Sequence, residues 1–198
     1  MEPSRKTLLI DAWKNEAHRP EAAPDRLSTL EDVAEFESSY SVVLPETFKA
    51  FLIDCGASSF NDQDWQCSVF DLNVGEHKVR DMVTHNYIFN VKQISDSLFE
   101  LNEELPDFWE TEAPLIPPQM IPIADSLSRD RGFLLMNVSE KHYGTLWHWR
   151  FIQEAWGDKD NNMLLEVSVS FDSWLDAMKS WDEAEALIAQ QDKAEKST

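Results

Sequence analysis

The sequence predicts a single α+β domain, with helices in its N-terminal part, a mainly antiparallel sheet of about five to six strands, and a closing C-terminal helix. Three observations lead to this fold class. Apolar residues between positions 30 and 52 recur at helical spacing, positions 120–169 contain several short strand-like runs, and an amphipathic segment follows position 170. Helices followed by closely spaced strands are typical of α+β domains.

The first 27 residues predict a leader and a linker in front of the domain. Residues 8–13 favour a short helix anchored by Trp13. Pro20 and Pro24 prevent residues 17–25 from remaining helical, because proline lacks a backbone N–H and clashes with the preceding turn. We expect the domain itself to span residues 28–185 and to end in a polar tail over 186–198.

Two helices open the predicted domain. Ser28 is a suitable N-cap for a helix over residues 29–39, with acidic residues in its first turn. Pro45 suits the first turn of a second helix, and Gly56 ends it. The buried side of this second helix consists of Phe48, Phe51 and Leu52.

The middle of the chain predicts one strand, further helical parts and an acidic loop. Residues 65–74 favour a strand that turns at Asn73–Gly75. We expect residues 76–105 to be helical in parts, and residues 105–118, with four prolines, to form a loop. The clearest helix in this segment has an apolar face made of Val91, Ile94, Leu98 and Leu101.

The C-terminal half predicts four strands and a helix. Residues 120–125 and 133–138 are apolar runs, and the second is continuous enough to be buried on both faces. Residues 145–152 alternate with a period of two, and residues 163–169 follow a polar turn. Ser170 then caps a closing helix whose buried side contains Phe171, Trp174, Leu175, Met178 and Trp181.

The net charge of −20 is the most unusual property of the sequence. Residues 1–28 contain equal numbers of acids and bases, so the excess of acids lies in the remainder, and residues 93–128 contain no Lys or Arg. Such a field repels nucleic acids and anionic membranes and attracts basic proteins. We therefore expect a protein partner, no nucleic acid and no membrane, although acidity can also serve solubility alone.

No motif for catalysis or metal binding is present. Cys55 and Cys67 have no CxxC spacing, the histidines lack ligand spacing, and neither a nucleophile elbow nor a glycine-rich phosphate loop occurs. The sequence predicts no enzyme activity, no cofactor and no metal. Since no secretory or membrane-spanning stretch is present, we expect the protein in the cytoplasm.

Two segments place a tryptophan among carboxylates in predicted loops. Aromatic anchors supply binding energy at interfaces, and acidic neighbours attract a basic partner, so both segments are candidate binding sites. The alternative is that both tryptophans fold back onto the core. The candidate residues are Asp62, Asp64, Trp65, Glu103, Glu104, Asp107, Trp109, Glu110 and Glu112.

The order of these blocks resembles the SUKH superfamily. Residues 30–37, Tyr40 and residues 44–52, with their Leu-Pro-Glu start, resemble the opening two helices of that family. Later blocks resemble its middle strands and its closing helix; they are residues 121–125, 132–136, 144–149 and 170–175. Two departures are Gly56-Ala57, where the family has a double glycine, and residues 126–132, where it has a glycine-rich acidic turn.

The resemblance implies a non-enzymatic α+β domain that binds proteins. Bacterial members of this superfamily commonly neutralise a cognate toxin, often a nuclease, and fungal members act as regulatory scaffolds. An immunity protein against a basic toxin agrees with the acidic charge, which is an independent feature of the sequence. An intracellular regulatory scaffold is the alternative function.

Overall fold

The computed structural model describes residues 3–19, 22–23, 25–61, 63–74, 77–102, 114–126, 132–150, 156–157 and 161–195. Within them the helices are α1 (Arg5–Ala17), α2 (Leu30–Tyr40), α3 (Glu46–Asp54), α4 (Val91–Asn102), α5 (Phe171–Ala177) and α6 (Trp181–Glu195). The strands are β1 (Ser58–Ser59), β2 (Cys67–Val74), β3 (His77–Ile88), β4 (Met120–Ser126), β5 (Gly132–Asn137), β6 (Leu146–Arg150) and β7 (Leu164–Ser168). A 3-10 turn, Glu140–His142, lies between β5 and β6.

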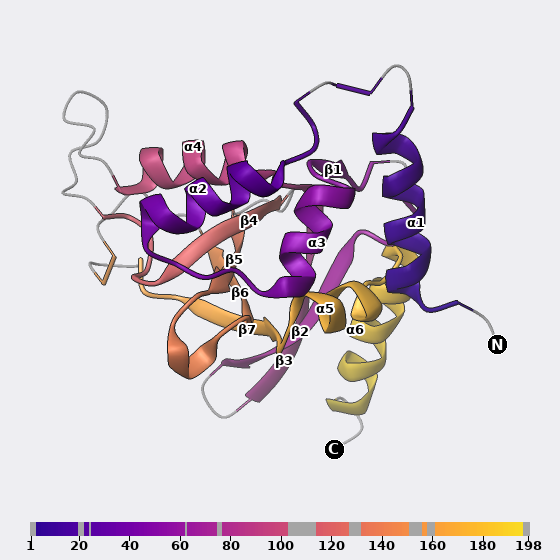
Figure 1. The fold of residues 1–198 in the computed structure, drawn as a ribbon. Coiled ribbons are helices and arrows are strands. Elements are labelled where there is room, and N and C mark those ends of the chain that lie inside the picture. Colours follow the sequence, from indigo (N-terminus) through magenta and orange to yellow (C-terminus); the bar gives the residue numbers. More distant parts are fainter. Residues whose placement is uncertain are drawn as a thin grey trace.

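These strands form one antiparallel sheet, which confirms the predicted α+β class (Figure 1). The strand order is β1-β3-β4-β5-β6-β7, and β2 pairs with β3 in a long hairpin. From β3 to β7 each strand pairs with the next in sequence, so the sheet is a meander interrupted by α4 between β3 and β4. Short connections of this kind favour antiparallel neighbours.

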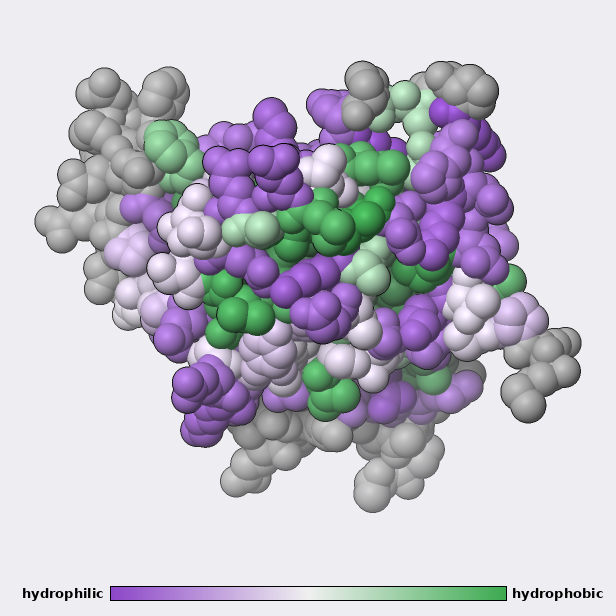
Figure 2. Space-filling view, viewed as in Figure 1, coloured by the Kyte–Doolittle hydropathy of each residue, from purple (hydrophilic) through white to green (hydrophobic). Residues whose placement is uncertain are grey.

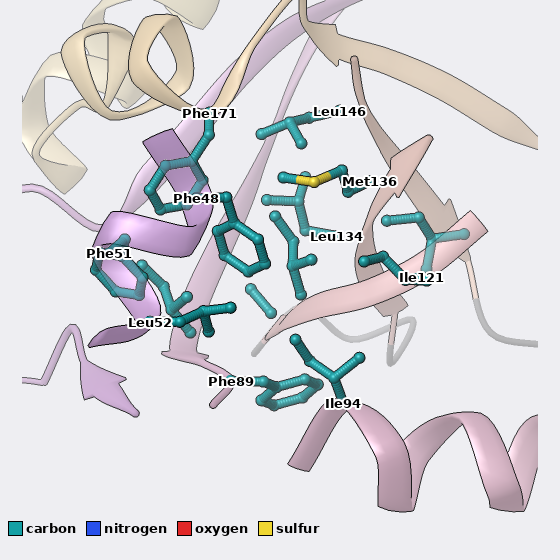
Figure 3. Packing of buried hydrophobic residues seen from close by; sticks show 14 of the residues in the cluster. Phe48, Phe51, Leu52, Phe89, Ile94, Ile121, Leu134, Met136, Leu146 and Phe171 are labelled. Atoms are coloured by element: carbon teal, nitrogen blue, oxygen red, sulfur yellow. The ribbon is translucent and has the colours of Figure 1, made fainter. Parts of the chain in front are cut away.

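The core lies between the helices and one face of this sheet. Phe48 of α3 and Phe171 of α5 meet edge to face with ring centroids 5.0 Å apart, and they point toward the side chains of β5 and β6 (Figure 3). In β5 the consecutive residues Leu134, Leu135 and Met136 are all fully buried, so both faces of this strand are covered as predicted. Each such side chain contributes about 1.5–3 kcal/mol of hydrophobic stabilisation.

The start of α2 differs from the prediction by one residue. Its N-cap is Thr29, whose hydroxyl accepts the Asp32 N–H while the Asp32 carboxylate accepts the Thr29 N–H at 2.7 Å, a reciprocal capping box. Ser28, the predicted cap, is buried and instead accepts the N–H of Val91 at the start of α4. The two helix starts are thus joined through one hydroxyl.

The sequence does not predict strand β3, because it favours helical parts over residues 76–105. The structure places residues 77–88 in the longest strand of the described sheet. The buried side of β3 includes Val83 and also His85, which is 1% exposed. A histidine at an inward position interrupts the apolar alternation by which strands are recognised. The helix predicted around Val91–Leu101 is present as α4.

The predicted closing helix is divided in two. α5 ends at Ala177, Met178 has extended backbone angles, and α6 begins at Trp181. Between them Lys179 pairs with Cys67 of β2, exchanging hydrogen bonds of 2.8 and 3.0 Å. The prediction that Trp181 belongs to the buried side is wrong, since this side chain is 44% exposed.

Helix α1 packs against α3 and α5. Trp13 is fully buried, its ring lies edge to face with Phe51 and Phe60, and its indole N–H donates to the Ser59 carbonyl at 2.9 Å. The predicted short helix around Trp13 is therefore present. The boundaries predicted at residues 27 and 185 stay predictions.

Candidate protein-binding surface

Two of the predicted binding residues, Asp64 and Trp65, lie within the described part of the chain. Asp64 is exposed, whereas Trp65 is half-buried against the core and the Arg5 guanidinium lies 5.7 Å from its ring centroid. The binding role of these two residues stays a prediction. The other predicted residues lie outside the described residues; they are Asp62, Glu103, Glu104, Asp107, Trp109, Glu110 and Glu112.

The basic side chains near the N-terminus are engaged within the molecule. Arg5 pairs with Glu183 of α6 at 2.6 Å, and Lys6 pairs with Asp172 of α5 at 3.2 Å. Lys14 pairs with Asp54 of α3 at 2.7 Å. These bases therefore neutralise acids on α3, α5 and α6, and leave the acids on α2 without a contribution from α1.

Helix α2 carries the acids Glu31, Asp32, Glu35 and Glu37 and no base. Within the described chain, Glu31 and Glu35 are exposed and have no cationic group at ion-pair distance. Hydrogen bonds from the backbone N–H and hydroxyl of Thr29 lower the pKa of the Asp32 carboxyl, which keeps this group ionised. Only Glu37 of this helix is neutralised, by Lys49 at 2.9 Å.

A groove runs between α2 and the beginning of α4. The segment before α2 is fixed to α4 by hydrogen bonds, because the Asn90 amide donates to the Asp25 carbonyl at 2.9 Å and the Val91 N–H donates to Ser28. Asn90 and Gln93 cap the start of α4 reciprocally, each accepting the other's N–H at 2.9 Å. Both walls of the groove are therefore held by local capping interactions.

The groove has a volume of about 800 Å³ and combines apolar and acidic lining. Its apolar lining includes Phe36 and Val91, both nearly buried. Its acidic lining consists of Asp25, Asp32 and Glu35. Apolar surface bordered by an excess of one sign of charge is the chemistry expected of a protein-docking surface rather than of an active site.

A second hollow differs from the groove in its charge. It lies between α1, α3 and α5, has a volume of about 220 Å³, and its lining includes both ion pairs Lys6–Asp172 and Lys14–Asp54. An apolar area over α3 adjoins it and is bordered by hydrophilic residues of α1 and α2 (Figure 2). Because the charges of this hollow are balanced, it offers no preference for a cationic partner.

One buried constellation has the residue types of a catalytic pair. The Ser68 hydroxyl lies 2.7 Å from His85 Nε2 and accepts the Trp174 indole N–H at 2.8 Å. Ser68 and His85 are 4% and 1% exposed, and Phe60 and Trp174 pack against the imidazole. With no access to solvent, this arrangement pairs the Ser68 hydroxyl, the His85 Nε2 and the Trp174 indole N–H inside the core and does not form a site for a substrate.

We expect His85 to make the protein less stable below pH 6.5. Burial, followed by the neighbouring His148, lowers the pKa of the His85 imidazole to about 3 from 6.5. Between these values the unfolded chain binds a proton that the folded protein excludes, so stability present above pH 6.5 falls by up to about 1.4 kcal/mol per pH unit as the pH decreases. Urea unfolding at pH 7.0, which lies above this interval, and at pH 5.5 and 4.5, which lie within it, measures the slope.

His85→Gln removes the titrating group and is expected to flatten this slope. His142→Gln, at an exposed position, is the matched control and keeps it. Equal slopes for the native protein and His85→Gln would show that the buried imidazole does not set the pH dependence.

The described residues show no other chemical centre. Among them no group of three or more His, Cys, Asp or Glu side chains is arranged to hold a metal ion. Cys55 and Cys67 are free and buried, and burial raises the pKa of the Cys55 thiol to about 12, so this sulfur stays protonated. None of the described helices combines the length and the apolar character needed to cross a membrane.

The fold and its surface define an α+β domain with an acidic helical face over an antiparallel sheet. The family model of the SMI1 / KNR4 family (SUKH-1) matches residues 28–177, and the chain belongs to this family. Domains of this family generally bind proteins and are generally not catalytic. No curated protein is similar enough to this chain to match it.

Proposed function

We propose that this protein is an immunity protein that binds and neutralises a basic toxin domain, of which a nuclease is the clearest case. The observation that carries the proposal is the unneutralised acidic face of α2, on a chain with a net charge of −20. A nuclease holds phosphates on a basic surface, so an acidic protein of matching shape covers the same surface and excludes the substrate.

Family membership supports a protein partner, and the charge supports a basic one. Opposite charges on two proteins accelerate their encounter and disfavour wrong partners. An inhibitor that must act before a toxin damages the cell benefits from such rapid association. A regulatory scaffold is the alternative within the same family and needs no single basic partner.

Co-expression with the toxin-like product of the neighbouring reading frame tests the proposal. We expect protection of the host cell and a complex that is isolated by size-exclusion chromatography. The Kd of the complex is expected to rise at least about tenfold between 50 and 500 mM NaCl, because the screening length for exposed charges falls from about 14 Å to about 4 Å.

Circular dichroism at both salt concentrations is the control that the fold is retained. The absence of both protection and a complex would contradict the immunity function. An isolated gene with no toxin beside it would favour the scaffold.

A further inference from the structure

The groove between α2 and α4 has an excess of negative charge. Asp25, Asp32 and Glu35 line it, and Lys92 is the one basic residue among the described residues of its lining. The Lys92 ammonium pairs with Asp96 on the next turn of α4 at 3.3 Å, so its charge is partly compensated within the helix. A cationic side chain entering the groove therefore meets three carboxylates, one of which is fixed in position by the capping box.

Aromatic side chains extend the apolar part of the groove. Phe36 lies beneath Tyr40, with ring centroids 4.8 Å apart, and the Tyr40 hydroxyl donates to the Ser95 carbonyl at 3.3 Å. Tyr40 is 37% exposed, so one edge of its ring remains available. Phe99, one helical turn beyond Ser95 on α4, is 59% exposed. The exposed edge of the Tyr40 ring provides contact area for an apolar side chain.

We propose that this groove receives a basic segment of the protein partner, with Arg or Lys side chains directed to Asp25, Asp32 and Glu35 and an apolar side chain placed on the exposed edge of Tyr40. The inference rests on the proposed function and assigns the docking surface to it. Charge complementarity identifies the occupant, since the carboxylates repel acidic proteins and nucleic acids and the groove is too wide and open for a metal ion.

Binding of a basic peptide to the full chain tests the inference. The probe is a fluorescein-labelled dodecapeptide of four Arg-Leu-Ser repeats, and fluorescence anisotropy gives its Kd. The groove variant is the double substitution Asp25→Lys with Glu35→Lys, because both side chains are exposed and neither caps a helix. We expect the Kd to rise at least about tenfold, which corresponds to 1.4 kcal/mol.

The matched control is Glu166→Lys with Glu185→Lys. These exposed residues lie on β7 and α6, away from α2 and α4 (Figure 1), and the two double variants change the net charge equally. We expect the control to raise the Kd less than about threefold, as only the long-range field changes. Thermal melts of both variants establish that each is folded.

The outcomes separate this inference from the proposed function. Equal weakening by the two variants would show that the peptide responds to overall charge, and failure of the native chain to bind the peptide would show that the groove does not accept basic segments. Either result overturns the groove assignment. The immunity function is decided separately, by co-expression with the neighbouring toxin-like protein.

Discussion

Replacing Trp13 by alanine is expected to lower the free energy of unfolding by about 3–5 kcal/mol, the range for large aromatic residues removed from a core. Trp13 is fully buried, makes edge-to-face contacts with Phe51 and Phe60 at centroid distances of 5.8 and 5.1 Å, and donates a hydrogen bond to Ser59. Alanine leaves a cavity between α1 and α3 and an unpaired carbonyl at its edge.

Chemical unfolding followed by circular dichroism measures this change. Trp181→Ala is the matched control, because this tryptophan is 44% exposed at the start of α6. Its loss is expected to cost less than about 1 kcal/mol. Equal destabilisation by the two substitutions would contradict the structural role assigned to Trp13 and, with it, the attachment of α1 to the domain.

Gly56→Ala is expected to destabilise the protein by about 2–5 kcal/mol. Gly56 has a φ of +63°, which costs a residue with a Cβ about 1–2 kcal/mol. An added Cβ would also lie 2.0 Å from the Arg26 carbonyl oxygen. That oxygen accepts the Ala57 N–H at 2.9 Å, so the backbone on both sides of the contact must move, which adds about 1–3 kcal/mol.

Gly157→Ala separates the two contributions to this cost. Gly157 also has a positive φ, of +93°, but an added Cβ meets nothing within 4 Å. We expect this control to lose only the conformational part, about 1–2 kcal/mol. Thermal and urea unfolding of both variants give the comparison, and a Gly56 variant no less stable than the Gly157 variant would refute the close approach to Arg26.

Signals from residues close together in the sequence were sufficient to predict most of the fold. Pro45 and Gly56 bound α3, Ser170 caps α5, and the apolar spacing of α4 agrees with its buried face. These features depend on residues within one or two turns of each other, so they can be predicted directly from the sequence. The continuous apolar run of β5 likewise indicated a strand covered on both sides.

The errors arise where contacts distant in sequence decide the backbone. The apolar spacing from Trp174 to Trp181 favours an unbroken helix, yet the backbone of Lys179 pairs with β2 more than a hundred residues away. His85 occupies an inward position on β3, where Ser68 bonds to its Nε2 and Trp174 packs against its ring. Neither partner is visible from the local pattern.

The groove was missed for the same reason. Among its acids, Asp32 belongs to the first turn of a helix, where an acid favours the helix dipole in any helix, and Asp25 belongs to the predicted linker. Their position opposite α4 depends on the hydrogen bonds of Asn90 and Ser28 that join segments more than sixty residues apart. By contrast, the tryptophans among carboxylates were chosen for the types of their neighbours in sequence, which do not indicate whether a side chain is buried.

The attachment of α1 to α5 and α6 constrains the order in which the domain assembles during synthesis. Arg5 bonds to the Met178 carbonyl and to Glu183, and the Lys6 N–H bonds to Asp176. The first turn of α1 therefore leaves the ribosome long before the residues that it contacts, and it is among the last segments to find its partners. A nascent chain that stops before residue 176 cannot complete α1 docking, so synthesis of α5 and α6 is a condition for closing the domain.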